Sequence, residues 1–188
     1  MNDLTTPGRD PVQTLEPLIE AVTEGVQVAG WALSGFQKTT SHQFEGRWEG
    51  DETRSAYLFF HKPGVWEDVS LDIYLDETTR GLKGNLALVL DGPELGTADP
   101  LSVMEALGRA ALDRLPRKYR TPVTLRFRLG EAGADPKGAP SEIRFKVDMP
   151  RAAVRAGSSA VVALATTTVR AFETLLGHPG LTAYVSTG

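Results

Sequence analysis

The segment VSLDIYLDETTRGLKGNLALVL, residues 69–90, carries the clearest pattern in the chain. Its first part alternates apolar and polar residues, which is typical of a strand with one buried face and one solvent-exposed face. The inward residues are expected to be Val69, Leu71, Ile73 and Leu75. A turn at 76–81 leads to a second strand, 82–90, whose inward face continues with Leu86, Leu88 and Leu90. The segment therefore predicts an antiparallel hairpin.

Two shorter alternating runs precede this hairpin. Phe44 and Trp48 alternate with charged residues and predict a strand over 43–49, and the run 55–61 predicts another. The sequence that follows, Lys62-Pro63-Gly64, fits a type II turn, because proline favours its second position and glycine its third. Four consecutive strands are therefore expected to form an antiparallel meander.

A helix is expected before the meander. Asp10 is a good N-cap, Pro11 suits the first helical position and Gln13 completes a capping box. Apolar residues then recur at helical spacing as far as Val26. Glycines occur near the end of this pattern and after it, at Gly25, Gly30 and Gly35. They are expected to loosen the connection, so the helix either packs on the sheet of its own domain or docks on a partner.

The second half of the chain repeats these signals. Asp99 and Pro100 predict the start of a helix that Pro116 stops, with a buried stripe of Leu101, Met104, Leu107, Ala111 and Leu115. Strands are expected over 123–129 and 143–149, joined by the loop 130–140. A last helix, capped by Ser158 or Ser159, is expected to end at Gly177.

The order of elements indicates an α+β fold, with a twisted antiparallel sheet of about six strands and helices on one face, in the order α-β-β-β-β-α-β-β-α. Residues 10–177 are expected to form a single domain, between a flexible N-terminus, 1–9, and a C-terminal tail, 178–188. The N-terminal residues have no apolar run typical of a secretory signal, and no long apolar segment predicts a membrane span. A cytoplasmic location is therefore expected.

The composition argues against several kinds of chemistry. The chain has 188 residues, no cysteine and three histidines, His42, His61 and His178, which lack the spacing of a zinc site. Ser34 and Ser41 lie in no nucleophile elbow, and Gly130, Gly133 and Gly138 miss the spacing of a dinucleotide-binding loop. We therefore expect neither an enzyme nor a bound cofactor or metal.

The formal net charge of -4 conceals an uneven distribution. Residues 117–148 carry a net charge of +4, whereas the rest of the chain carries -8. The candidate binding residues in this region are Arg117, Lys118, Arg120, Arg126, Arg128, Arg144 and Lys146. By strand alternation, four of them (126, 128, 144 and 146) lie on the outward side of two neighbouring strands.

This basic face has two interpretations. Its charges are either a solvated hairpin surface, paired with Asp68 and Asp72 across the sheet, or a binding surface for an acidic peptide tail or nucleic acid. Aromatic residues that would stack on bases are few, because only Tyr119 and Tyr74 are expected near the basic side. The three tryptophans, Trp31, Trp48 and Trp66, either fill the core or anchor a partner.

The order of elements resembles the type III secretion chaperone fold of the bacterial YbjN family. The segments that match best are 98–129, where a capped helix leads into a strand, and 142–176, where a strand ending in Met149 and Pro150 leads into the last helix. The likeness extends from Asp10 to Gly177 as a match of topology, without a shared motif.

The resemblance implies a chaperone-like, non-catalytic protein, usually a homodimer, that binds an extended segment of a partner protein. Members from bacteria that tolerate DNA damage suggest that the partner is a single-stranded DNA-binding protein or a DNA-repair protein. The alternative is that the chain binds nucleic acid directly, through the basic face of strands 121–129 and 142–149.

Overall fold

A computed structural model describes residues 11–40, 54–65, 69–91, 100–117, 120, 123–126 and 142–179. They form a six-stranded antiparallel sheet in the order β1-β2-β3-β4-β6-β5. The strands are β1 (Ala32–Thr40), β2 (Arg54–His61), β3 (Val69–Thr78), β4 (Gly81–Asp91), β5 (Val123–Arg126) and β6 (Glu142–Asp148). The helices are α1 (Leu15–Val28), α2 (Pro100–Arg114), α3 (Arg151–Arg155) and α4 (Ser158–Leu176). The predicted α+β class and the order of its main elements are confirmed.

The alternation at residues 69–90 produces the central hairpin of the sheet. Leu71 lies opposite Leu88, and Ile73 lies opposite Leu86, so large apolar residues pair across β3 and β4 on the same face. All four of these side chains are at most 2% exposed. Burial of this row is the main local driving force for the register, because a slip by one residue would turn every leucine toward water.

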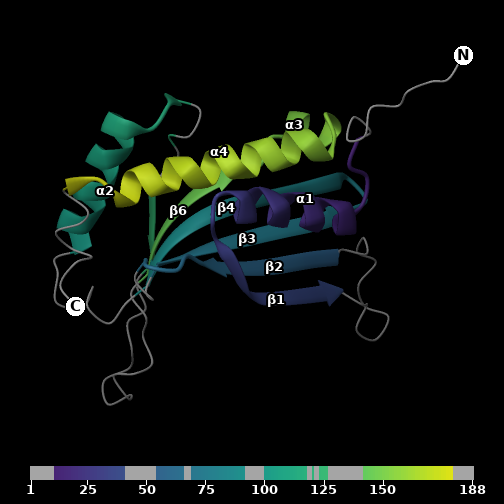
Figure 1. The fold of residues 1–188 in the computed structure, drawn as a ribbon, viewed down its shortest axis with the longest axis horizontal. Coiled ribbons are helices and arrows are strands. Elements are labelled where there is room, and N and C mark those ends of the chain that lie inside the picture. Colours follow the sequence, from purple (N-terminus) through teal and green to yellow (C-terminus); the bar gives the residue numbers. More distant parts are fainter. Residues whose placement is uncertain are drawn as a thin grey trace, which may run out of the picture.

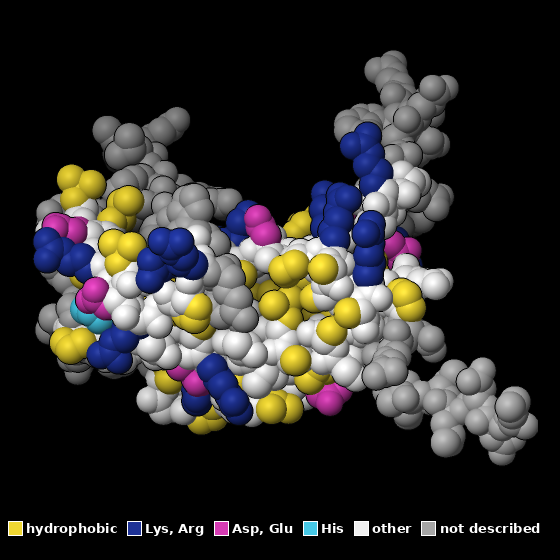
Figure 2. Space-filling view, turned by 90° about the horizontal axis from the view of Figure 1, so that it is seen from above, with side chains coloured by type: hydrophobic (Ala, Val, Ile, Leu, Met, Phe, Trp, Pro, Cys, Tyr) yellow, Lys and Arg dark blue, Asp and Glu magenta, His cyan; other side chains and the backbone are white. Residues whose placement is uncertain are grey.

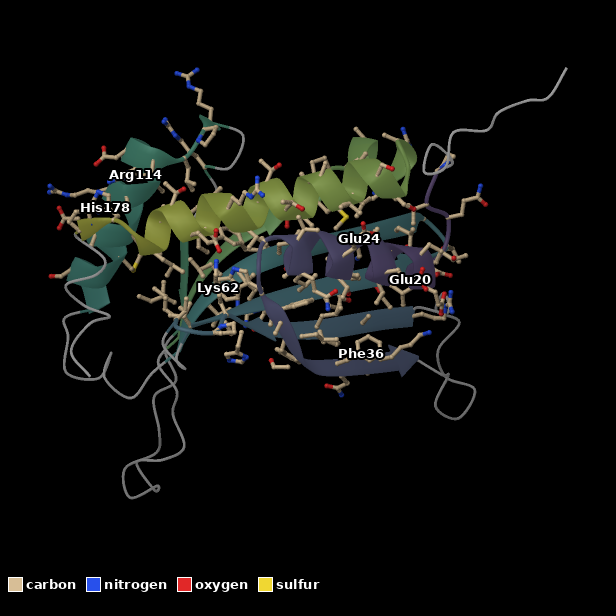
Figure 3. All side chains as sticks on the ribbon, viewed as in Figure 1. Glu20, Glu24, Phe36, Lys62, Arg114 and His178 are labelled. Atoms are coloured by element: carbon tan, nitrogen blue, oxygen red, sulfur yellow. The ribbon has the colours of Figure 1, made fainter. Side chains whose placement is uncertain are left out.

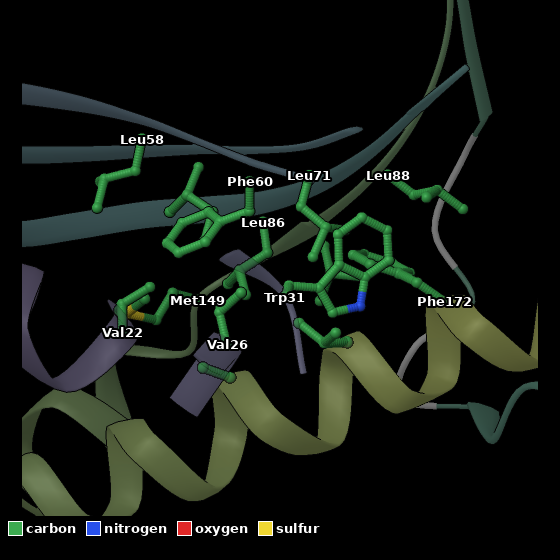
Figure 4. Close-up of a cluster of buried hydrophobic side chains, with 14 of the residues drawn as sticks. Val22, Val26, Trp31, Leu58, Phe60, Leu71, Leu86, Leu88, Met149 and Phe172 are labelled. Carbon is green, nitrogen blue, oxygen red and sulfur yellow. The ribbon is translucent and has the colours of Figure 1, made fainter. Parts of the chain in front are cut away.

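Helices α1 and α4 lie side by side over this apolar face, and α2 lies at one end of the sheet (Figure 1). Figure 4 shows how side chains of the two layers meet: Val22 and Val26 of α1 and Phe172 of α4 face Phe60, Leu86 and Leu88 of the strands. The core therefore lies between one face of the sheet and the two helices, and the opposite face of the sheet, which we call the open face, bears no described helix.

The first helix begins later than the sequence predicts. It starts at Leu15 instead of next to Pro11, because the backbone N–H of Val12 donates to the carbonyl of Val154 and holds this segment extended. The backbone N–H of Leu15 is capped by the Glu77 carboxylate of β3, at 2.6 Å, and not by a local side chain. The capping-box prediction is therefore wrong for residues 11–13, while Asp10 lies outside the described residues.

The first strand lies where no strand is predicted. β1 spans Ala32–Thr40, in the segment expected to be loosened by glycines, and the predicted strand 43–49 lies outside the described residues. A register shift between Leu33 and Gly35 interrupts the alternation and explains why the pattern is not apparent. Helix α1 packs on its own sheet through the buried side chains of Leu18 and Val22, and Gly30, at φ +87°, makes the turn into β1.

The later helices follow the prediction with two changes. α2 begins at Pro100 as expected, but Leu101, expected in its buried stripe, is 69% exposed. A short helix, α3, precedes α4, and the N-cap of α4 is Gly157 at φ +102° rather than Ser158 or Ser159. A positive φ is accessible to glycine at little steric cost, which allows the tight turn between the two helices.

One described helix, α4, is long and apolar enough to cross a membrane by length and composition. The side facing α1 and the sheet, including Val161, Val169 and Phe172, is buried in the protein core. Such burial is typical of the core helix of a soluble protein, so α4 is weak evidence for a membrane span. The cytoplasmic location stays a prediction. The predicted flexible N-terminus, 1–9, and most of the predicted tail, 178–188, lie outside the described residues.

Candidate functional site

The structure separates the basic residues singled out in the sequence. Arg144 and Lys146 lie on the open face of β6, and Arg126 lies in the neighbouring β5 opposite Glu142. Arg117 and Arg120 follow the end of α2, where the Arg120 guanidinium donates to the carbonyls of Leu112 and Leu115. Lys118 and Arg128 lie outside the described residues.

Ion pairs balance the charge on the open face of the sheet. Arg144 bonds to Asp72 at 2.9 Å, as one of the two interpretations of the basic face expects. The other two described pairs are Lys83–Asp76 at 3.1 Å and Lys146–Asp148 at 3.5 Å. On the face seen from above, the described Lys and Arg side chains also stand in separate groups, with hydrophobic and acidic side chains among them (Figure 2). The face shown in Figure 2 therefore has no continuous basic surface over the described residues.

The open face carries more aromatic rings than expected from the sequence. Tyr57 and Tyr74 lie in register on β2 and β3 with ring centroids 4.9 Å apart, and Phe59 lies on the same side of β2. With Asn85, Arg144 and Lys146 they line a hollow of ≈ 460 Å³. The inward positions of Leu58 and Phe60 could have revealed this, since alternation then turns residues 57 and 59 outward.

A second concave region lies on the other side of the sheet, between α1 and the edge strand β1. This groove has a volume of ≈ 400 Å³, and its lining residues are Ile19, Glu20, Thr23, Glu24, Gln27, Leu33, Phe36 and Leu58. The Phe36 side chain is 52% exposed, and Leu33 is 41% exposed. Figure 3 shows Phe36 on β1 beneath Glu20 and Glu24 of α1. An apolar floor with an acidic rim therefore adjoins the outer edge of the described sheet.

The acidic rim of the groove consists of Glu20 and Glu24, one helical turn apart on α1. Both residues are exposed, and neither has an ion-pair partner among the residues whose contacts the structure describes. In contrast, Glu16, one turn earlier, forms ion pairs with Lys38 and with Arg54. The groove thus has two carboxylates whose charge no described cation compensates.

An ion-pair network lies one helical turn before the acidic rim of the groove, around Glu16. The Arg54 guanidinium bonds to both carboxylate oxygens of Glu16, at 2.8 and 3.2 Å, and to Glu77 at 2.6 Å. Glu77 in turn caps the first N–H of α1. The hydrogen bond from Lys38, together with the Arg54 guanidinium, lowers the pKa of Glu16 from 4.5 to about 2. The network joins the start of α1 to β1, β2 and β3.

The pKa of Glu16 leads to a prediction about acid stability. Because the pKa is depressed in the folded protein, the stability that Glu16 contributes is complete above its unfolded pKa of 4.5 and is lost as pH falls toward about 2. The variant Glu16→Gln should therefore be less stable than the wild type near neutral pH, and this difference should shrink between pH 4.5 and pH 2. Urea denaturation at several pH values measures it.

The matched variant Glu20→Gln removes a carboxylate of the same helix that has no ion-pair partner in the described structure. Its effect on the urea midpoint should be small, because solvent-exposed charges without partners contribute little. A Glu16→Gln difference that stays constant from neutral to acidic pH would contradict the role assigned to the Lys38 and Arg54 contacts.

A second cluster lies near the turn between α1 and β1. Trp31, at the start of β1, is 1% exposed, and its indole N–H donates to Glu173 of α4 at 3.1 Å. Lys62 forms an ion pair with the same carboxylate and also approaches the carbonyl of Ala29. Trp31 therefore belongs to the core, while Trp48 and Trp66 lie outside the described residues. The turn between α1 and β1 is tied to α4.

A serine–histidine contact lies at the edge strand β1. Ser34 Oγ lies 2.7 Å from Nδ1 of His61, but it also bonds to the Phe59 carbonyl, and no carboxylate bonds to His61 among the described residues. His178, just after the end of α4, lies 3.4 Å from Asp113 of α2. No group of three or more potential metal ligands occurs within the described part of the chain. The described groove combines an apolar lining with the carboxylates Glu20 and Glu24.

No protein-family model, curated protein or solved structure matches this chain. The likeness to the YbjN family stays a prediction from the order of elements.

Proposed function

We propose that this protein is a non-catalytic binding module that takes up an extended segment of a partner protein by strand addition to β1. The observation that carries the proposal is the position of exposed Phe36 and Leu33 in an apolar groove directly beside the outer edge of the sheet. An edge strand presents unpaired N–H and C=O groups, which a second extended chain satisfies through main-chain hydrogen bonds.

The length and support of β1 favour this mode of binding. β1 has nine residues and is the terminal strand in the sheet order, paired with β2 along most of its length. It is held by the Lys38–Glu16 pair at one end and by the buried Trp31 at the other. A pre-ordered edge reduces the entropy that binding must overcome, because only the added segment becomes ordered.

Alternate side chains of an added strand would point to opposite faces of the sheet. Those on the helix side would enter the groove and cover Phe36 and Leu33, while the others would lie beside Gln37, which pairs with Tyr57 on the open face. Main-chain bonds would supply affinity and the groove would supply selectivity. This is the chaperone-like activity that the resemblance implies.

A labelled nonapeptide tests the proposal. In it threonine alternates with valine, glutamine, glutamine and valine, so that the larger side chains share one face. Phe36→Asp should weaken its binding about tenfold or more in fluorescence anisotropy, because it places a charge in an apolar contact. Leu112→Asp is the matched control, since Leu112 is 63% exposed but lies on α2.

Peptides methylated at backbone nitrogen separate strand addition from simple apolar contact. Methyl groups on the alternate amides that face β1 remove the ladder hydrogen bonds, so binding should be lost, whereas methylation of the other set should leave most of it. Equal binding by both methylated peptides, or an equal loss from Phe36→Asp and Leu112→Asp, would refute strand addition to β1.

Direct nucleic-acid binding remains a second candidate function, favoured by the rings of Tyr57 and Phe59 beside Arg144 and Lys146 on the open face. Bases stack on exposed aromatic rings, and cations contact phosphates. The balancing carboxylates Asp72 and Asp148 weaken the attraction for a polyanion. Anisotropy with a labelled single-stranded oligonucleotide, before and after Tyr57→Ser, tests this function in the same assay.

The homodimer and a partner from single-stranded DNA metabolism also stay proposals that rest on the resemblance. Sedimentation of the full chain over a range of concentrations measures the first. The second is tested by direct titration with a purified single-stranded DNA-binding protein.

A further inference from the structure

The charge around the groove indicates which kind of segment it takes up, and this inference rests on the proposed strand addition to β1. We propose that the occupant is a basic segment of a partner protein, with two arginine or lysine residues spaced by two on the face that enters the groove. The two carboxylates of the rim, Glu20 and Glu24, receive these cations, while Phe36 and Leu33 contact their aliphatic stems.

The spacing of the two rim carboxylates fits a strand. Residues four apart on a helix are separated by about 6 Å along its axis. Residues two apart on a strand, which share a face, are separated by about 6.6 Å. Glu20 and Glu24 are four apart on α1, so cations at alternate positions of an added strand match their separation closely.

The chemistry of the groove suits long basic side chains. Arginine and lysine bury their methylene stems along apolar surface and keep their charged ends in polar surroundings. The groove offers this combination, because exposed Phe36 lies on the strand and the carboxylates lie on the helix above it (Figure 3). An arginine over the Phe36 ring also gains a cation–π contact.

The neighbouring charges limit where cations bind. Glu16 is already paired with Lys38 and Arg54, so its charge is neutralised. Glu20 and Glu24 have no such partner among the described residues. Within the described part of the chain, the uncompensated negative charge of the groove therefore lies at Glu20 and Glu24, and an acidic segment would be repelled there.

This assignment differs from the acidic peptide that the sequence suggests for the basic strands. That expectation concerns the open face, where Arg144 already pairs with Asp72. The groove lies on the opposite, helix-covered side of the sheet and has the opposite sign of charge. A strand added to β1 would meet the acidic rim of α1, not the basic residues of β6.

Three forms of the nonapeptide test the charge of the occupant against the full-length protein. They differ only in the two central groove-facing residues, which are both arginine, both glutamine or both glutamate. The arginine form should bind about tenfold more tightly than the glutamine form, as two exposed or partly exposed ion pairs allow, and the glutamate form should bind most weakly. Added salt should reduce the preference for arginine.

The double variant Glu20→Gln, Glu24→Gln should reduce the gap between the arginine and glutamine peptides to about twofold or less. It should leave the binding of the glutamine peptide nearly unchanged, because both side chains are exposed and keep their size. Glu105→Gln, which changes an exposed carboxylate on α2, is the matched control and should preserve the full preference for arginine.

Each contrary result has a distinct meaning. Equal affinity for all three peptides, with Phe36→Asp still weakening them, would overturn the basic occupant and leave strand addition in place. Failure of all three to bind would overturn strand addition and the inference with it. Self-association that Phe36→Asp abolishes and that excludes the arginine peptide would assign the groove to a second copy of the chain and overturn the inference.

Discussion

Replacing Gly25 with alanine should lower the free energy of unfolding by about 2–3 kcal/mol, because α1 and α4 touch at this residue. A Cβ atom at Gly25 would lie 2.5 Å from the carbonyl oxygen of Val162 and 2.7 Å from the Cβ of Ala165. Both neighbours belong to rigid parts of α4, so the helices would have to move apart. The Thr166 hydroxyl, which donates to the Gly25 carbonyl at 2.8 Å, would then be strained as well.

Gly108→Ala is the control for this variant. Gly108 lies within α2, and nothing surrounds the position of its missing Cβ within 4 Å. Alanine should therefore stabilise the protein there by about 0.5–1 kcal/mol, through its higher helix propensity. Urea denaturation of the two variants measures the contrast, and an equal gain at both positions would show that α1 and α4 do not approach each other as described.

Gly25 also illustrates what local sequence patterns convey. Periodicity predicts the two strands at 69–90, the helix that begins at Pro100 and the helix that ends at Leu176. It does so because it indicates which side of an element is buried. A glycine at a helix crossing leaves no periodic signal. From the sequence alone, Gly25 suggests a loose connection, whereas in the structure it allows α1 and α4 to approach closely.

The candidate site was predictable in part for the same reason. Alternation correctly places Arg144 and Lys146 on the outward face of their strand. It does not give the order of strands. The sequence therefore left open whether Arg144 pairs with Asp72, which lies on β3 across the intervening β4. Neither the pairing of cations nor the rings beside them follows from composition.

The groove was not predictable from the sequence pattern. Leu33 and Phe36 are an odd number of residues apart, yet both line the groove, because the register shift between Leu33 and Gly35 adds a residue to the strand. An alternating template therefore rejects this segment as a strand. The acidic rim on α1 was visible as the polar side of a helix, but its proximity to an edge strand depends on the tertiary fold.

Trp31→Ala should have the largest effect on stability, a loss of about 3–5 kcal/mol, because it leaves a large cavity in the core. Trp31 is among the largest fully buried side chains and lies between the strands and α4, beside Leu71 and Phe172 (Figure 4). The variant also removes the indole N–H that donates to Glu173. Since small domains are stable by about 5–15 kcal/mol, a large part of the stability depends on this residue.

Phe36→Ala is the control for Trp31→Ala, because it truncates a large side chain in the groove instead of in the core. Phe36 is five residues further along the chain but 52% exposed, so its truncation should change the free energy of unfolding by no more than about 0.5 kcal/mol. It should nevertheless weaken the binding of the arginine nonapeptide. Urea denaturation and anisotropy on the same samples separate the two roles: Trp31 fixes the start of β1 from within the core, and Phe36 contacts the occupant from outside. Equal losses of stability from both variants would contradict this division.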